Sequence, residues 1–159
     1  RCEDYAYRFG VEFHAGEKPW GRVKADVYMP CATQNEIGLE DAKRMIEEGT
    51  SKLLIEVANM PTKAEAVEEL QKSGFMIAPS KAVNAGGVAV SALEMSQNAM
   101  KLSWTEEEVD EKLKKIMKNI FNNIDSAAKK YGMDGNLIAG ANIAGFLKVA
   151  EAMLNEGIF

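Results

Sequence analysis

The chain has 159 residues, 47% of them hydrophobic and 27% charged, so it is long enough for one domain with a real core or for pieces of two. The formal net charge is −5 and no cluster of Lys or Arg forms a stripe, which argues against nucleic acid as a partner. The longest uninterrupted apolar stretches are far shorter than a membrane span, and no signal peptide is apparent. We therefore expect no membrane partner and a cytoplasmic location. Because the chain starts at Arg1 rather than at Met, we expect a processed product or a piece of something longer.

Helices and short apolar strands alternate in the first half of the chain. Strands are expected at residues 11–13, 25–29, 53–57 and 75–78. The end of a helix is expected over residues 2–9. A second helix is expected over residues 39–48, and Gly49 ends it. Thr62 and Glu65 form a capping box that opens a third helix, which closes at Gly74. This order of elements, with short links, predicts a parallel doubly wound sheet.

From Val88 onward the pattern contains helices only. The first of them runs to about Leu102, and Thr105 with Glu108 makes a capping box for the second. One apolar stripe marks that second helix: Val109, Leu113, Ile116, Met117, Ile120, Ile124 and Ala127. The last helix, residues 137–154, begins with residues small enough for close packing: Gly140, Ala141, Ala144 and Gly145. Five methionines are expected to fill the core: Met95, Met100, Met117, Met133 and Met153.

Neither the cysteines nor the histidine suggests a metal site. Cys2 and Cys31 are the only cysteines, and their spacing fits no metal or redox motif. Two free thiols in a reducing compartment are favoured over a disulfide. His14, the only histidine, has no Cys or His beside it. It is expected to be a surface or loop residue rather than a ligand or a catalytic base.

Small residues and side-chain amides follow three successive predicted strands. In a doubly wound sheet, ligands bind beyond the carboxyl ends of the strands. The residues at these ends are Ala32 with Gln34 and Asn35, Ala58 with Asn59, and Asn84 with Ala85. A single amide of this kind is usually a turn former, but three at equivalent places favour a shared ligand edge.

The longest distinctive stretch is the turn between the last predicted strand and the first long helix. Pro79 stops the strand, and Gly86 and Gly87 leave no bulk where the helix begins. The first turn of that helix has unpaired N–H groups that suit a carboxylate or a phosphate. Ser91 lies one turn further along, on roughly the same face. A plain strand-to-helix turn without a ligand is the alternative.

Six motifs of the chain carry a family resemblance. They are residues 30–36 (Pro-Cys-Ala-Thr-Gln-Asn-Glu), 58–62 (Ala-Asn-Met-Pro-Thr), 79–88 (Pro-Ser-Lys-Ala-Val-Asn-Ala-Gly-Gly-Val), 91–98 (Ser91 and Glu-Met-Ser-Gln-Asn), 102–104 (Leu-Ser-Trp) and 140–146 (Gly-Ala-Asn-Ile-Ala-Gly-Phe). With these motifs the chain resembles the glutamate dehydrogenase family, of the smaller-subunit hexameric type. The resemblance covers nearly all of this chain but only the C-terminal part of the family's chain.

This resemblance implies reversible oxidative deamination of L-glutamate to 2-oxoglutarate and ammonium, with hydride transfer to NAD or NADP. The residues that it implies beside the cofactor are Ala32, Thr33, Asn59 and Asn84, and those at the substrate are Ser91 and Val88. The family's catalytic lysine and aspartate have no matching motif here and belong to an upstream domain. The chain also has no G-x-G-x-x-G turn, so the choice between NAD and NADP is open.

For the fold, the resemblance implies the C-terminal half of a Rossmann-like doubly wound parallel sheet followed by C-terminal helices. Residues 1–87 are then the second half of the nucleotide-binding domain, and residues 88–159 a helical segment between that domain and the substrate domain. The missing N-terminal part would be the main partner, within a homohexamer, and the chain alone is expected to be inactive. Two alternatives are a stand-alone nucleotide-binding or interaction module and another amino-acid dehydrogenase. Ser91 and the Pro79-Ser80-Lys81 sequence favour glutamate, since relatives for apolar substrates lack them.

Overall fold

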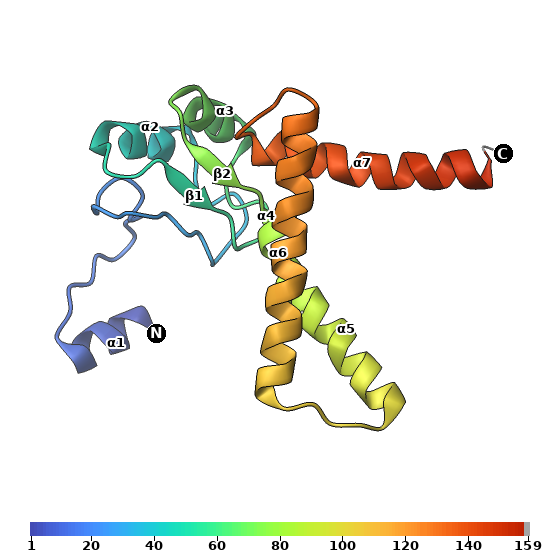
Figure 1. Cartoon of the computed structure of the whole chain (residues 1–159). Coiled ribbons are helices and arrows are strands. Elements are labelled where there is room, and N and C mark those ends of the chain that lie inside the picture. Colours follow the sequence, from blue (N-terminus) through green and yellow to red (C-terminus); the bar gives the residue numbers. More distant parts are fainter. Residues whose placement is uncertain (158–159) are drawn as a thin grey trace.

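The structure, a computed structural model, describes residues 1–157 of the chain. Figure 1 shows a small parallel sheet with helices around it, from which α1, the α5–α6 hairpin and α7 extend outward. In chain order the elements are α1 (Cys2–Phe9), α2 (Leu39–Glu48), β1 (Leu53–Ile55), α3 (Ala64–Lys72), β2 (Met76–Ala78), α4 (Ser80–Val83), α5 (Ala85–Met100), α6 (Glu106–Lys130) and α7 (Leu137–Glu156). The fold is therefore α/β, with a small parallel sheet and helices.

The sheet is smaller than the sequence predicts. Within residues 1–157 it has two strands, β1 and β2, which pair in parallel with Leu54 opposite Ile77. The predicted strand at residues 25–29 is reduced to one parallel bridge between Tyr28 and Leu54. The predicted strand at residues 11–13 is wrong, because this segment forms a loop in which Val11 and Phe13 are exposed. A strand needs a neighbouring strand for its N–H and C=O groups, and a short apolar run cannot supply one.

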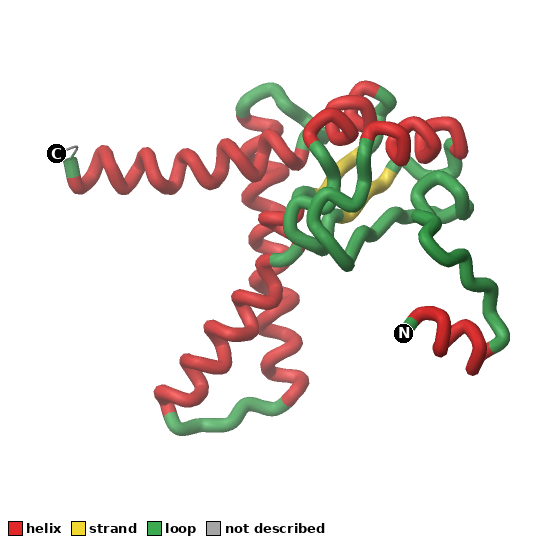
Figure 2. Tube along the Cα trace, turned by 180° about the vertical axis from the view of Figure 1, so that it is seen from behind, coloured by secondary structure: helices red, strands yellow, loops and turns green. Residues whose placement is uncertain are grey.

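One core lies between the sheet and two helices. Figure 2 shows α2 and α3 lying over the strands on one side of the sheet. The largest fully buried side chains are Ile37, Met45, Leu54, Leu70, Pro30 and Pro61, and the first four belong to this core. The predicted capping box at Thr62 and Glu65 is wrong, since α3 begins at Ala64 with Lys63 as its N-cap. Thr62 is instead buried and bridges to Ile37, so packing against a distant segment decides its position.

Two predictions for the C-terminal helices are confirmed. At the start of α6, Glu108 N donates to Thr105 Oγ1 at 3.3 Å and Thr105 N donates to Glu108 Oε2 at 2.8 Å, which is the predicted capping box. Gly140 of α7 packs so closely on α6 that it faces the backbone carbonyl of Ile124 and the Cβ atom of Ala128. These contacts fix the crossing of α6 and α7, since only a residue without a side chain fits there.

The prediction that methionines fill the core is wrong. Met95, Met100, Met133 and Met153 are exposed, with Met95 at 67%, and Met117 is half-buried. The reason is the shape of the molecule: no residue of α5 is buried, and α6 and α7 reach away from the sheet. Methionine side chains suit packing surfaces, but in this chain the surfaces around them are not covered.

Helix α7 is long and apolar enough to cross a membrane by length and composition alone. Its first turns are buried against the rest of the molecule through Leu137, Gly140 and Ala141, whereas Phe146 and Leu154 further along are exposed. A helix that belongs to the interior of a larger soluble protein satisfies the same criterion. The absence of a membrane partner therefore stays a prediction.

Candidate functional site

The carboxyl ends of β1 and β2 lie at the same edge of the sheet, and a loop leaves from each. Glu56 N donates to Ala78 O at 3.0 Å, which extends the parallel pairing by one residue beyond β1. Pro79 is buried and acts as the N-cap of α4, with an extended backbone conformation that ends β2. The loop after β1 and the turn after β2 therefore begin side by side.

Two side-chain amides meet at this edge. Asn59 lies in the loop after β1, and Asn84 joins α4 to α5. Asn84 Nδ2 donates a hydrogen bond to Asn59 Oδ1 at 2.5 Å. The proximity follows from the parallel strand ends, as the sequence pattern indicates. The binding role of both residues remains a prediction.

A hollow of about 540 Å³ opens beside the amide pair. Its lining consists of small, amide and hydroxyl residues with two valines: Val57, Ala58, Asn59, Asn84, Gly87, Val88 and Ser91. It therefore contains four of the six predicted site residues: Asn59, Asn84, Val88 and Ser91. No side chain and no other segment lies within 4 Å of the position where Gly87 would carry a Cβ atom. A ligand can consequently approach the backbone of the first turn of α5, in which Gly87 N donates to Asn84 O at 3.3 Å.

The other two predicted site residues, Ala32 and Thr33, do not line this hollow. They are exposed in the loop that follows the bridge at Tyr28. Backbone hydrogen bonds fasten this loop beside the loop after β1: Ala58 N donates to Pro30 O at 2.9 Å, and Asn35 N donates to Met60 O at 3.0 Å. Three loops thus lie along one edge, but the structure brings only two of them into contact with the hollow.

Sequence reasoning missed two polar residues that hold this edge together. Glu56 directly follows β1 and is 6% exposed, and its carboxylate accepts a hydrogen bond from Ser80 N at 3.1 Å. Asn142 of α7 accepts a hydrogen bond from Lys81 Nζ of α4. A signal for Glu56 was present, because it is the one charged residue in the otherwise apolar run 53–58. A charge that is fully buried usually has a specific partner.

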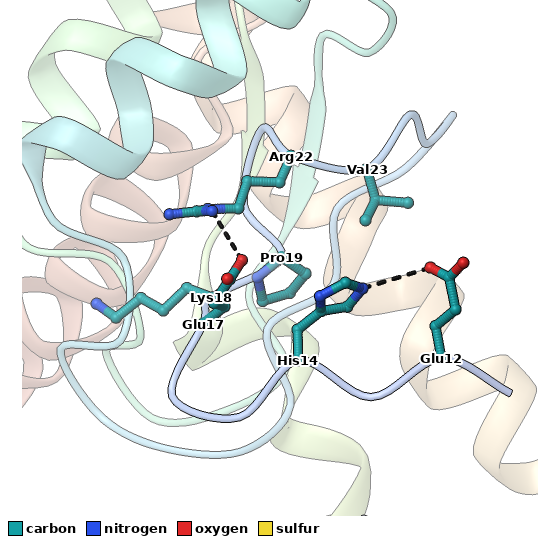
Figure 3. A pocket seen from close by; sticks show the side chains of 7 residues that line it. All are labelled: Glu12, His14, Glu17, Lys18, Pro19, Arg22 and Val23. Carbon is teal, nitrogen blue, oxygen red and sulfur yellow. Dashed lines mark hydrogen bonds and ion pairs between the residues drawn. The ribbon is translucent and has the colours of Figure 1, made fainter. Parts of the chain in front are cut away.

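A second hollow, of about 500 Å³, lies elsewhere, in the loop between α1 and α2 (Figure 3). Its charged residues are exposed, and four of its side chains form two pairs: Arg22 Nη1 lies 2.7 Å from Glu17 Oε2, and His14 Nε2 lies 3.4 Å from Glu12 Oε2. Lys18 points away to Asp41, whose Oδ2 lies 3.2 Å from Lys18 Nζ. None of the six predicted site residues lines it. We therefore assign no binding role to this hollow. The prediction that His14 is a surface loop residue is confirmed.

Two further sequence predictions concern the thiols and a metal site. Cys2 and Cys31 are both free and exposed, which confirms the expectation of two free thiols. In the part of the chain from Arg1 to Gly157, no group of three His, Cys, Asp or Glu side chains is placed to hold a metal ion.

A third hollow, of about 320 Å³, lies on the face of the sheet that α2 and α3 do not cover. It is almost wholly apolar and combines the outer side chains of both strands with residues of three helices: Leu53, Ile55, Met76, Ala78, Pro79, Ala82, Val83, Met117, Ile120, Phe121, Ile124 and Leu137. We call it the apolar face hollow. Helix α6 borders this face without closing it.

Taken together, these features define an α/β protein with a polar hollow at the carboxyl ends of its parallel strands. The model of the Glutamate/Leucine/Phenylalanine/Valine dehydrogenase family matches residues 2–157, and the chain belongs to this family. This confirms the resemblance found in the sequence motifs.

Individual relatives support the same family assignment. The chain is 55% identical over 159 residues to the NAD-specific glutamate dehydrogenase of Clostridium symbiosum. This match covers 99% of this chain and 35% of the relative. It is 49% identical to the NADP-specific glutamate dehydrogenase of Haemophilus influenzae, over 100% of this chain and 35% of that protein. A solved structure of glutamate dehydrogenase 2 from Plasmodium falciparum is 46% identical and superposes with a TM-score of 0.92, over 99% of this chain and 34% of its own. The chain thus spans about a third of the length of the relatives that it matches.

Proposed function

We propose that this chain is part of an oxidoreductase that reversibly deaminates L-glutamate to 2-oxoglutarate and ammonium, with hydride transfer to NAD or NADP. The observation that carries the proposal is the 55% identity to a glutamate dehydrogenase across 99% of the chain. The polar hollow supports it, because it gathers Asn59, Asn84, Val88 and Ser91 at the strand edge where such folds bind ligands. Both NAD-specific and NADP-specific enzymes are among the relatives, so the proposal includes both cofactors.

The residues fit this role by their chemistry. The nicotinamide cofactor supplies the hydride acceptor, which must keep one ring face toward the reacting carbon. Asn59 and Asn84 form a linked pair of amides with donors and acceptors that can orient the nicotinamide-ribose half of the cofactor. Ala32 and Thr33 would lie beside the cofactor on the neighbouring loop.

On the substrate side, Val88 and Ser91 both line the polar hollow on α5. The Ser91 hydroxyl would donate to the side-chain carboxylate of glutamate, and Val88 would line the same pocket. A hydroxyl is suited to this task because it binds the carboxylate without reacting with it. The catalytic lysine and aspartate would come from the upstream domain, so no residue of this chain is proposed as catalytic.

Replacement of Ser91 by alanine in the complete enzyme should mainly weaken binding of glutamate and 2-oxoglutarate. A hydrogen bond to a charged group contributes about 1.5–3 kcal/mol, so kcat/KM for glutamate should fall roughly tenfold to a hundredfold. Activity toward norvaline, which lacks the side-chain carboxylate, should barely change. Ser96→Ala is the matched control, because Ser96 lies on the same helix and donates to Ala92 O rather than lining the hollow. An equal loss of glutamate and norvaline activity in Ser91→Ala would show that Ser91 does not contact that carboxylate.

For the architecture, we propose that residues 1–87 are the second half of a Rossmann-like nucleotide-binding domain. Residues 88–159 would then be a helical segment between this domain and the substrate domain. Support comes from the sheet, since a doubly wound sheet is covered on both faces and the apolar face hollow is open here. Upstream strands and helices of the same protein would extend the sheet and cover this face. A homohexamer in the cytoplasm is the assembly and location that we propose for the complete enzyme.

One further experiment distinguishes the proposed function from two alternatives. Another amino-acid dehydrogenase of this family would share the Asn84–Val88 turn, and a stand-alone nucleotide-binding or interaction module would need no upstream domain. The complete reading frame that contains this chain should be expressed and assayed with glutamate, leucine, phenylalanine and valine. Glutamate-dependent formation of NADH or NADPH is expected. Turnover of an apolar amino acid without glutamate turnover, or a frame that lacks a Gly-rich turn and a Lys-rich substrate domain upstream, would overturn the proposal.

A further inference from the structure

Glu56 is a buried carboxylate that the proposed chemistry does not use. It directly follows β1, is 6% exposed, and lies three residues before Asn59. Burying a carboxylate is unfavourable unless specific donors stabilise it. The donor that the structure provides is the backbone N–H of Ser80, 3.1 Å from Glu56 Oε2, at the start of the turn after the other strand. The side chain therefore crosses from one loop of the site to the other.

From Ser80 the connection continues to the amide pair. Ser80 O accepts a hydrogen bond from Asn84 N at 2.9 Å, and Ser80 Oγ lies 3.4 Å from Met60 N, next to Asn59. Asn84 Nδ2 then donates to Asn59 Oδ1, which returns to the loop after β1. The hydrogen bonds and the backbone from Glu56 to Asn59 thus form a closed ring. In a closed ring of this kind, the position of each amide depends on the contact at the opposite side.

We infer that Glu56 is a positioning residue, whose hydrogen bond to Ser80 holds Asn84 in register with Asn59 for binding the nicotinamide cofactor. This inference rests on the proposed function, because it gives the amide pair a ligand. A purely structural role, in which Glu56 only caps the short helix α4, predicts a loss of stability without a specific loss of cofactor binding. The two roles can therefore be separated by experiment.

The chain offers a matched control for a buried capping carboxylate. Asp41 is also 6% exposed, and its Oδ2 accepts a hydrogen bond from Gly38 N at 2.9 Å at the start of α2. It lies on a helix that contributes no residue to the polar hollow. Asp41 also pairs with Lys18 and Arg44, so its removal should cost at least as much stability as removal of Glu56, without an effect on the amide pair.

The first test is titration of the complete enzyme with NADH and NADPH, followed by cofactor fluorescence. Loss of a hydrogen bond to a charged group corresponds to roughly a tenfold change in equilibrium constant, so Glu56→Ala should raise the Kd about tenfold. Glu56→Gln keeps an acceptor of the same length and should bind within about threefold of wild type. Asp41→Ala should lower the melting temperature but leave the Kd within about twofold of wild type.

A double-mutant cycle then asks whether Glu56 acts through Asn84. In the Asn84→Ala background, Glu56→Ala should produce no further rise in Kd, because the amide that it positions is already absent. Fully additive effects, or a Glu56→Ala enzyme that binds cofactor as tightly as wild type, would overturn the inference. If Glu56→Ala fails to fold, Glu56→Asp takes its place, since its shorter side chain keeps the charge but does not reach Ser80 N.

The last test does not depend on cofactor binding. In a crystal structure of the Glu56→Ala enzyme, Asn84 Nδ2 and Asn59 Oδ1 should be separated beyond hydrogen-bonding distance. If the two atoms remain within roughly 3.2 Å, Glu56 does not position the pair. A wild-type enzyme that binds neither NADH nor NADPH would contradict the proposed function, while this crystal structure would still decide the role of Glu56.

Discussion

The isolated chain of 159 residues is expected to form no NADH or NADPH from glutamate, and to bind either cofactor weakly at best. The crevice of a doubly wound sheet is built from both halves of the domain, and the half with the Gly-rich turn holds the pyrophosphate. This chain has no such turn, and in the proposed function its polar hollow would contact only the nicotinamide-ribose half of a cofactor. Absorbance at the reduced-cofactor band and fluorescence titration would measure both quantities. Glutamate-dependent reduction of cofactor by the pure chain would refute this expectation.

The same chain should self-associate, since at least one sheet edge and several apolar surfaces have no cover. The apolar face hollow is open, and large hydrophobic side chains extend over α5, α6 and α7. Exposed apolar patches and unpaired strand edges promote association in water. Sedimentation velocity should therefore show dimers or larger species.

A pair of variants tests whether the apolar face hollow drives this association. Phe121 lines the hollow and is 51% exposed, so Phe121→Glu should shift the chain toward monomer. Tyr131 is 47% exposed but does not line the hollow, and Tyr131→Glu should leave the association unchanged. A stable wild-type monomer that binds NAD as tightly as a complete dehydrogenase would instead support the stand-alone module.

Gly140→Ala should destabilise the chain more than any other substitution that adds a single methyl group to the C-terminal helices. A Cβ atom at this position would overlap the backbone carbonyl of Ile124, which cannot move without separating α6 from α7. Overpacking usually costs about 1–3 kcal/mol, and a clash with backbone lies at or above the upper end of that range. Thermal unfolding followed by circular dichroism, at one fixed chain concentration, would show the change.

Gly145→Ala is the matched control on the same helix. No side chain and no other segment lies within 4 Å of the position of its Cβ, and its backbone is helical. Alanine stabilises a helix interior by about 0.5–1 kcal/mol relative to glycine, so this variant should melt at the same temperature or slightly higher. Similar melting temperatures for the two variants would mean that the α6–α7 contact does not determine stability.

Helix positions could be predicted from the sequence where local signals determine them. The predicted helix at residues 39–48 has the bounds of α2, because its apolar positions repeat at helical spacing and Gly49 adopts the left-handed conformation that ends it. The capping box at Thr105 likewise placed the start of α6. Each of these signals involves residues no more than four positions apart.

Predictions that depended on distant partners were less successful. The expected strand at residues 11–13 has no neighbour to pair with, and Thr62 packs against Ile37 instead of capping α3. The exposed methionines show the same limitation, since an apolar side chain is buried only where another surface covers it. No pattern along a single helix contains that information.

For the candidate site, the sequence by itself determined the residue types at the strand ends, the family motifs and the glycine turn that begins α5. Only the tertiary structure decided which of these residues meet. Asn84 bonds to Asn59 across 25 residues of chain, and Glu56 bonds to Ser80 across 24. It also left Ala32 and Thr33 outside the polar hollow. The physical reason is that such contacts exist only after parallel strands have paired, and pairing depends on packing of the whole sheet rather than on local backbone preference.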